Sequence, residues 1–549
     1  MKHTILLPSA IWQGYDPDAE ALEPQLLAED KRENIHMQTY VVTALSEGDD
    51  KLLVAVKIYR PDSGVGQTIL IVPEYHRPPS RELIFDLAKS GFTVVVPDLS
   101  GVAHPPTIFP KAYEYGNFDK AGDHIKRVTP TAKETSQYLY TIIIKRMLAF
   151  IKQSLPLNPI GLVGLGDAVE VAMQAAGSGG KVGALACLNS AGYREYIRLN
   201  KYGGGKELVM DEERIAWLAG VASVAYAKYI NVPTFIAIGT NSEKSDIDRV
   251  ENLLALIPGD RTYTSFSPRT SDFLLPYTYR TFKLWLQKTL SGEAFPDCPR
   301  AMVRVNEEGK IYVDIDCDPS SMIEKVTVYY SYGEYNHEIR DWLKKEGISV
   351  SFNEFIATIE VSDPDAPLFV FAEVRYENGI ALSSLPEYME LAGQPVKAKP
   401  IIKPSRIVFE PSNGKDVFVE CYKGEVLMDY ALEIVAPNSA KGISSKIGSL
   451  KTYHIDRHLN IPSESLLQVE LFSSEPREVT ITLQNKVEDG IKKYAAVINI
   501  TDTKGFFIGN KLKASDFKDE RMMPLAAWSN IRSIEINGGD IIIGNILFI

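Results

Sequence analysis

The chain has 549 residues, of which 45% are hydrophobic and 24% are charged. This length is sufficient for about three domains of ordinary size, and these proportions exclude disordered and fibrous proteins. The formal net charge of -12 opposes binding to the phosphates of nucleic acids and to acidic membrane surfaces. We therefore expect neither a nucleic acid nor a membrane as a partner.

The amino-terminal segment lacks the pattern of a secretion signal. Only three apolar residues, Ile5 to Leu7, precede Pro8, whereas a signal peptide has about 7 to 15 apolar residues. A membrane span needs about 18 to 20 uncharged apolar residues, and the nearest run, Tyr140 to Ile151, is interrupted by Lys145 and Arg146. These features predict a cytoplasmic protein.

The four cysteines are widely separated, at Cys187, Cys298, Cys317 and Cys421. No C-x-x-C pair indicates a zinc or redox site, so we expect reduced thiols, no metal and no cofactor. A disulfide between Cys298 and Cys317 is the alternative if the protein is exported.

Between residues 50 and 290, short β-branched strands alternate with longer helical stretches, which is typical of parallel β-α-β units. Predicted strands cover Lys51 to Tyr59, Thr68 to Val72, Phe92 to Val96, Ile160 to Val163, Val182 to Leu188 and Thr234 to Ile238. Predicted helices cover Arg81 to Ser90, Tyr138 to Ser154, Asp167 to about Ala176 and Thr278 to Leu290. This order predicts a doubly wound α/β sheet.

Beyond Pro296 the pattern changes to alternating strands separated by turn residues, which predicts an all-β region. The first part is expected to be an immunoglobulin-like sandwich. The segment Ala392 to Pro400, rich in Pro, Gly and Lys, predicts a linker to a further β domain that ends in the apolar strand Ile541 to Ile549. The predicted domains cover residues 1–292, 293–396 and 397–549.

Three motifs give residues 50–290 a resemblance to α/β hydrolases of the dienelactone-hydrolase and acetylxylan-esterase type. They are Thr68 to Tyr75, the strand and turn Gly91 to Gly101, and the strand-to-helix junction Ile160 to Ala168. In such enzymes the third motif carries the G-x-S-x-G nucleophile elbow, in which small residues flank a serine in a tight turn. The resemblance implies an esterase fold with a Ser-His-acid site.

The positions that match this catalytic triad carry other residues. Gly166 stands where the serine is expected, Ser242 stands where the acid is expected, and Ser271 lies where the histidine is expected. No histidine occurs from Ile125 to Asn336. A serine hydrolase needs an oxygen nucleophile and an imidazole that carries its proton, so we predict that this domain is catalytically degenerate.

Other side chains near the predicted cleft keep a hydrolase possible in a rearranged form. Glu74, Tyr75 and His76 lie in the loop that would build an oxyanion hole, and His104 follows the next strand. Asp167 would be a nucleophile only in a shifted frame that places Leu165 at a small-residue position, and Glu243 would have to replace the acid from one position further along. For the histidines and for Glu243, an ordinary loop residue is the alternative interpretation.

The carboxyl-terminal segments Gly505 to Gly509, Leu512 to Asp519, and Ile541 to Ile549 resemble the end of family 11-like carbohydrate-binding jelly rolls. The resemblance implies carbohydrate as a partner, bound by exposed aromatic rings and polar neighbours. Candidate glycan contacts are Tyr330, Tyr332 and Trp528, although strands are generally rich in aromatic residues and Trp528 is also a candidate core residue.

These observations lead to two main hypotheses. The first is a degenerate carbohydrate-esterase-like protein that binds a glycan or another protein. The second is an active esterase on small or carbohydrate esters that uses Glu74, His76, Asp167 or Glu243. A purely structural role in an oligomer is a third alternative, and the sequence does not indicate an oligomeric state.

Overall fold

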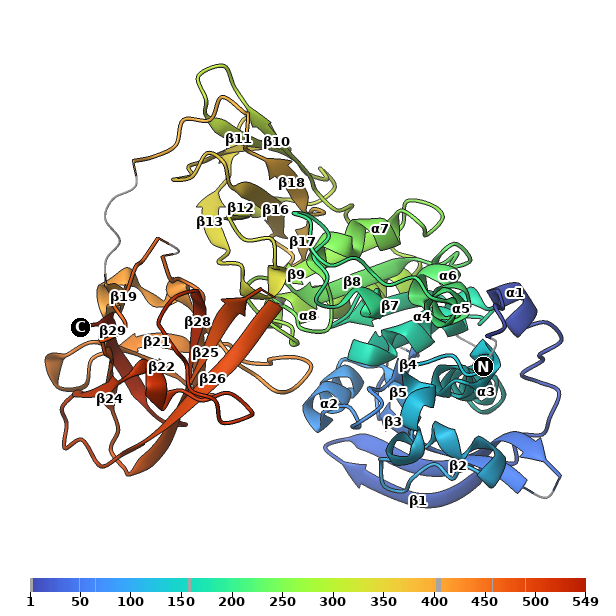
Figure 1. Ribbon diagram of the computed structural model, residues 1–549. Helices are drawn as coiled ribbons and strands as arrows, with labels where there is room; N and C mark the ends of the chain where they lie inside the picture. The colour runs from blue at the N-terminus through green and yellow to red at the C-terminus, as the bar shows by residue number, and fades with distance from the viewer. Residues whose placement is uncertain are drawn as a thin grey trace.

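The computed structural model describes residues 3–48, 50–64, 66–156, 159–400, 406–456, 458–488 and 490–549. The chain forms a nine-stranded sheet with helices on both faces, followed by two regions built from antiparallel sheets (Figure 1). The last strand of the large sheet ends at residue 267, and the first strand of the middle region begins at residue 300. The last strand of the middle region ends at residue 390, and the first strand of the carboxyl-terminal region begins at residue 407. The exact domain boundaries at residues 292 and 396 stay a prediction.

The large sheet has the order β1-β2-β3-β5-β4-β6-β7-β8-β9. Strands β1, β2 and β3 are antiparallel, and all pairs from β5 to β9 are parallel. The crossed order of β5 and β4, next to an antiparallel β3, resembles that of an α/β-hydrolase sheet. The strands are β1 Gln25–Arg32, β2 Ile35–Glu47, β3 Asp50–Pro61, β4 Thr68–Val72, β5 Thr93–Pro97, β6 Ile160–Leu165, β7 Ala184–Leu188, β8 Thr234–Gly239 and β9 Thr262–Ser267.

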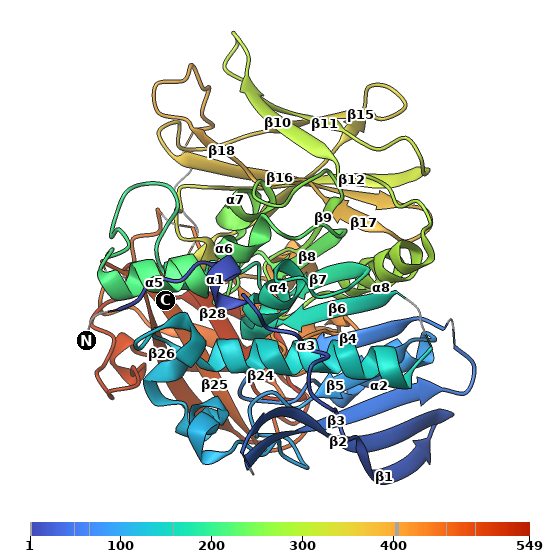
Figure 2. The same cartoon turned by 90° about the vertical axis from the view of Figure 1, so that its right-hand side faces the viewer.

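Two layers of helices bury the parallel strands, as expected for strands that are apolar on both faces. Helices α3 and α4 pack on one face and α2 and α8 on the other, and Figure 2 shows α3 lying across the strands. Ser80 caps α2 by accepting a hydrogen bond from the Leu83 N–H, and Pro276 begins α8. The helices are α1 Pro8–Ile11, α2 Arg81–Lys89, α3 Ser136–Ser154, α4 Val169–Gly177, α5 Glu212–Gly220, α6 Ser223–Ala227, α7 Val250–Leu254 and α8 Pro276–Ser291.

The middle region consists of two antiparallel sheets, β10-β11-β15-β14 and β13-β12-β16-β17, and β18 pairs with β16. Its core is continuous with the α8 face of the large sheet, because β17 lies against β9: the hydroxyls of Thr264 and Ser265 donate to backbone oxygens of β17. The strands are β10 Arg300–Val305, β11 Ile311–Asp316, β12 Ile323–Tyr332, β13 Leu343–Glu346, β14 Ile348–Ser349, β15 Glu354–Ile359, β16 Pro367–Tyr376, β17 Ala381–Ser383 and β18 Glu387–Glu390.

The carboxyl-terminal region also has two antiparallel sheets, β21-β22-β29-β24-β27 with β19 on β29, and β20-β23-β28-β25-β26. They share one apolar core, and the apolar last strand lies between β22 and β24, as its sequence predicted. The strands are β19 Ile407–Phe409, β20 Phe418–Glu420, β21 Leu432–Val435, β22 Gly442–Ser445, β23 Ser449–Thr452, β24 Leu467–Phe472, β25 Arg477–Val487, β26 Gly490–Ile500, β27 Ile508–Leu512, β28 Ile531–Asn537 and β29 Ile542–Phe548.

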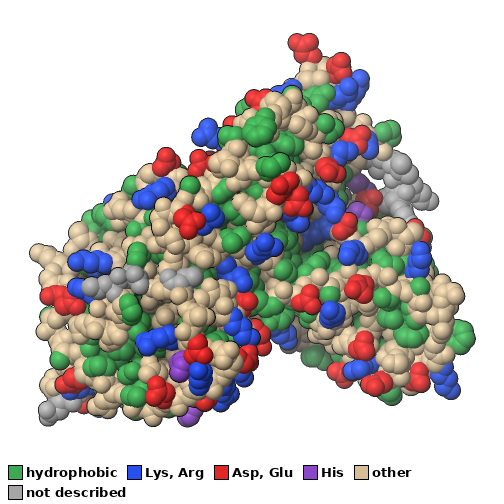
Figure 3. Space-filling view, turned by 180° about the vertical axis from the view of Figure 1, so that it is seen from behind, with side chains coloured by type: hydrophobic (Ala, Val, Ile, Leu, Met, Phe, Trp, Pro, Cys, Tyr) green, Lys and Arg blue, Asp and Glu red, His purple; other side chains and the backbone are tan. Residues whose placement is uncertain are grey.

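Seen from behind, the surface has a notch between the lobe of the large sheet and the carboxyl-terminal lobe (Figure 3). In the part of the chain that the structure describes, no helix combines the length and the apolar character needed to cross a bilayer. The four cysteines are free thiols, so the alternative disulfide between Cys298 and Cys317 is not formed.

Candidate functional site

The strand-to-helix turn after β6, which we call the elbow, has a left-handed residue at its centre and carries no side chain there. Gly166 has a φ of +48°, a left-handed conformation that L-residues rarely adopt. A Cβ atom added there would overlap Oε1 of Glu74 and would lie 2.9 Å from its Cδ. The carboxylate of Glu74 therefore occupies the space that a serine side chain would need.

Glu74 is held in this space by two cations. Its side chain is 4% exposed, Lys244 Nζ pairs with its Oε1, and Arg77 Nε lies 2.7 Å from its Oε2. Burial alone would raise the pKa of Glu74, but the positive charges of Lys244 and Arg77 lower it below its usual value. A buried carboxylate with two cationic partners is ionised and fixed, so we call Glu74, Arg77 and Lys244 the elbow ion cluster.

The two histidines beside the elbow do not face a nucleophile. His76 Nε2 lies 3.6 Å from Glu74 Oε2, and the His76 side chain is 42% exposed. His337, from the middle region, donates through Nε2 to the backbone oxygen of Ser242, over 2.9 Å, and its Nδ1 lies 3.4 Å from Oδ1 of the buried Asp246. Among the described residues, neither ring contacts a serine hydroxyl or a cysteine thiol. His104 is exposed and lies outside the elbow ion cluster.

The side chains at and beside the positions that match the acid and the histidine form bonds with other residues. Ser242 Oγ donates to Asp272 Oδ1 at 2.7 Å, and burial raises the pKa of Asp272. Glu243 forms a 2.5 Å ion pair with Lys493 of the carboxyl-terminal region. Ser271 lies in the following loop and lines a cavity with Glu243. The Ser242 hydroxyl is thus bound to Asp272, and the Glu243 carboxylate is bound to the carboxyl-terminal region.

Both β-rich regions bind to the carboxyl edge of the large sheet. From the carboxyl-terminal region, the Glu425 backbone oxygen accepts from the Asn189 side chain at 2.9 Å and from the Leu274 N–H at 3.0 Å. From the middle region, Arg340 forms a bidentate pair with Asp248, with N···O distances of 2.6 and 2.7 Å. This edge, where open α/β sheets bind ligands, is therefore covered by the chain itself.

A buried acidic group lies at the start of α4, directly after the elbow. Glu170 is 2% exposed, and neither of its carboxylate oxygens has a hydrogen-bond partner among the described residues. Burial, followed by the charge of nearby Glu195, raises the pKa of Glu170 to about 8. Tyr75 is also buried here and donates to the backbone oxygen of Asp167 at 2.9 Å, while the Asp167 carboxylate lies 3.8 Å from Arg194.

A cavity of about 430 Å³ lies between the large sheet and the sheet that contains β23 and β28. We call it the interdomain cavity. Glu243 and Ser271 line one side, and Lys451 and Glu535 line the other. Lys451 Nζ lies 4.7 Å from the centre of the Tyr453 ring, and neither Lys451 nor Glu535 has an ion-pair partner among the described residues. Hydrogen-bonding groups thus converge on this cavity from two domains.

The three predicted glycan contacts lie in different environments. Tyr332 lines a smaller cavity of about 220 Å³ between the two β-rich regions, and Tyr330 is half-buried on the same strand. Trp528 is 1% exposed, packs against Phe517 and Phe548, and donates from its indole N–H to a backbone oxygen at 2.8 Å. This placement confirms the interpretation of Trp528 as a core residue and corrects its inclusion among the candidate glycan contacts, because a buried indole offers no face to a sugar.

Sequence reasoning identified Glu74 but missed the partners that define its role. Lys244 directly follows Glu243 in the loop where an acid was expected, and Arg77 directly follows His76. Both cations are thus adjacent to candidate site residues, which could have indicated that they lie close to Glu74. Glu425 and Arg340 carry no local signal, because they reach the site from other domains.

About half of this chain is similar in structure to solved esterases. No family model matches the sequence, and no curated protein matches it. An acetyl xylan esterase from Paenibacillus sp. R4 is 12% identical, with a TM-score of 0.38, over 51% of this chain and 91% of its own. A glucuronoyl esterase from Solibacter usitatus is 10% identical, with a TM-score of 0.36, over 52% and 91%. A cold-adapted esterase from an Arctic intertidal metagenomic library is 11% identical, with a TM-score of 0.33, over 48% and 97%.

Proposed function

We propose that this protein is a catalytically degenerate, carbohydrate-esterase-like α/β hydrolase that binds a carbohydrate and does not hydrolyse it. One observation carries the first half of the proposal: the carboxylate of Glu74 fills the side-chain space of the elbow at Gly166. Acyl transfer would need a nucleophile in that space and an imidazole beside it. The elbow offers a paired carboxylate instead, which supports a structural use of this domain.

The interdomain cavity supports the carbohydrate half of the proposal. Its volume of about 430 Å³ falls within the range of small-molecule sites, about 300–1,000 Å³. Lys451, Glu535 and Asn537 present donors and acceptors from one sheet, and Tyr422 adds an aromatic ring. Sugars bind to such combinations, since polar groups bind their hydroxyls while aromatic rings pack on the ring faces. We further propose that the two β-rich regions are an immunoglobulin-like sandwich and a jelly-roll module.

Hydrolysis is tested with 4-nitrophenyl acetate and acetylated xylan. We expect no turnover above that of a buffer control, and no difference between the unmodified protein and His76→Ala. Turnover that disappears in His76→Ala would overturn the degenerate site and support an esterase with a rearranged site that uses Glu74 and His76.

Carbohydrate binding is tested by calorimetric titration with plant and bacterial polysaccharides and their oligosaccharides. We expect binding to weaken about tenfold in Glu535→Ala, as for loss of a hydrogen-bonding charged group, and to be unchanged in Glu478→Ala, which alters an exposed glutamate on β25 of the same sheet. Tyr332→Ala tests the smaller cavity as the location. Absence of binding to every glycan would remove the carbohydrate half of the proposal.

A further inference from the structure

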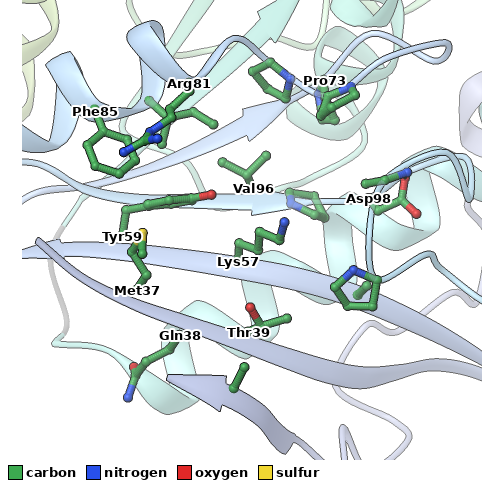
Figure 4. A pocket seen from close by; sticks show the side chains of 18 of the residues that line it. Met37, Gln38, Thr39, Lys57, Tyr59, Pro73, Arg81, Phe85, Val96 and Asp98 are labelled. Atoms are coloured by element: carbon green, nitrogen blue, oxygen red, sulfur yellow. The ribbon is translucent and has the colours of Figure 1, made fainter. Parts of the chain in front are cut away.

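A second cavity lies on the α2 face of the large sheet, and Glu74 and Arg77 of the elbow ion cluster form part of its lining. It has a volume of about 390 Å³, and strands β1, β2, β3 and β5 form its floor. Helix α2 and the loops after β4 and β5 form its walls (Figure 4). We call it the strand pocket. The sheet extends beyond α2 at this edge, so no second helix fills the space.

The upper wall of the strand pocket is apolar and rigid. Proline rings from the loop after β4 and from the end of β5 line it together with Phe85 of α2 and Val96 of β5, and Arg81 lies over the Phe85 ring with 4.6 Å to its centre. Tyr59 packs edge-on against Phe85, with 5.9 Å between ring centres. The apolar lining residues are Pro73, Pro78, Pro79, Phe85, Val96 and Pro97. Such a wall fits a flat apolar group.

The floor presents three polar groups from adjacent strands. Lys57 and Tyr59 lie on the same face of β3, and Thr39 lies beside them on β2. In Figure 4 the ammonium of Lys57 and the hydroxyl of Tyr59 both point into the cavity. None of these three side chains has a hydrogen-bond or ion-pair partner among the described residues, although all three are half-buried.

The acidic groups around the strand pocket, in contrast, have partners. Glu74 pairs with Arg77 and Lys244. Asp98 accepts from the Thr107 N–H at 2.6 Å, and Asp30 pairs with Arg32 at 2.8 Å. Glu29 accepts from the Gln38 side chain at 2.8 Å, so Glu29 and Asp98 are held by hydrogen bonds and not by cations. Lys57 is the cation of this pocket that has neither an ion-pair nor a hydrogen-bond partner among the described residues, and such a half-buried cation favours an anionic ligand.

We propose that the strand pocket binds a small monocarboxylate with a flat apolar body. Lys57 and Tyr59 hold the carboxylate by charge-assisted hydrogen bonds, and the apolar body lies between Phe85 and the prolines. A dianion such as a phosphate ester is disfavoured, because one free cation would face it with Asp30 and Asp98 nearby. This site is independent of the carbohydrate proposal, since it shares no lining residue with the interdomain cavity.

The test is calorimetric titration of the full chain with 2-naphthoate and with its neutral counterpart, 2-naphthamide. We expect saturable binding of 2-naphthoate and weakening of about tenfold or more in Lys57→Met. Binding of 2-naphthamide is expected to be weaker and to be the same in both proteins, because it has no charge for Lys57 to compensate.

Two further variants show whether a loss of binding comes from the strand pocket itself, from a change in the overall charge, or from misfolding. Arg60→Met removes the same charge from the opposite, exposed face of β3 and is expected to leave binding unchanged. Ala28→Trp, on the exposed edge strand β1, is expected to block the strand pocket and abolish binding while the thermal unfolding transition is retained. Absence of saturable 2-naphthoate binding, equal losses in Lys57→Met and Arg60→Met, or full affinity in Lys57→Met would each overturn the proposal.

Discussion

The elbow and the strand pocket both adjoin the loop after β4, but their charges are balanced in opposite ways. At the elbow, the Glu74 carboxylate has two cationic partners, and segments from both β-rich regions cover the sheet edge. In the strand pocket, Lys57 faces open space without a partner among the described residues. A paired charge contributes to holding the fold, whereas an unpaired one in a cavity is available to a ligand. The charges at the elbow are therefore neutralised within the chain, whereas the charge of Lys57 is not.

The largest expected effect concerns the covered edge. Arg340→Met removes the partner of Asp248, and both side chains are almost fully buried, with 0% and 2% exposed. A buried carboxylate left without its partner is costly, so the free energy of unfolding should fall by about 3–5 kcal/mol. Guanidinium chloride denaturation measures this change. The control is Arg304→Met, which breaks an exposed pair with Asp314 and should lower the free energy of unfolding by about 1 kcal/mol or less. Equal losses in Arg340→Met and Arg304→Met would show that the buried pair does not hold the covered edge in place.

A smaller effect, dependent on pH, is expected beside the elbow at Glu170. Its pKa is raised to about 8, so the folded protein holds a proton that the unfolded chain releases above about pH 4.5. Stability is therefore lost as pH rises from about 4.5 to 8. Glu170→Gln cannot ionise and should match the unmodified protein at pH 5 but be more stable at pH 8.5, on the order of 3 kcal/mol.

Denaturation at both pH values measures this difference, with Glu212→Gln as an exposed control. If Glu170→Gln gave the same difference from the unmodified protein at both pH values, Glu170 would not be neutral in the folded state.

Restoring the expected serine should disturb the elbow without producing an enzyme. The Gly166→Ser side chain would overlap Glu74, and it would occupy a left-handed backbone position, so we expect a loss of roughly 1–3 kcal/mol in stability. The loss should shrink when Glu74→Ala is also present, because the two sites are coupled through contact. Release of 4-nitrophenol from 4-nitrophenyl acetate by Gly166→Ser would contradict the absence of a working base.

The sequence allowed the parallel strands and their helices to be predicted, because each is an apolar run with clear boundaries. The hairpin of β1 and β2 was not predicted: β1 is exposed along its whole length, so it carries no apolar pattern. Strand β9, Thr262–Ser267, was missed for a related reason, since its hydroxyl-rich sequence is buried through hydrogen bonds to β17 rather than through apolar side chains.

The absence of a side chain at the centre of the turn after β6 follows directly from the sequence, because Gly166 stands at that position. The group that fills the space was not predictable, since it depends on how the loop after β4 folds back over the turn. Lys57 was also missed: it lies inside a predicted strand, where an exposed lysine is the ordinary expectation, and only the sheet's extension beyond α2 places it in a cavity.

The smallest expected effect is on stability in the strand pocket, and it separates a ligand-binding residue from a structural one. Because Lys57 has no partner among the described residues, Lys57→Met leaves no group unpaired, and a methionine side chain can occupy the same half-buried position. The free energy of unfolding should change by no more than about 0.5 kcal/mol, measured by urea denaturation without ligand. Added 2-naphthoate should stabilise the unmodified protein more than Lys57→Met, since a ligand stabilises the state that it binds. A loss above about 2 kcal/mol without ligand would mean that Lys57 holds the sheet together, as Arg340 does at the covered edge.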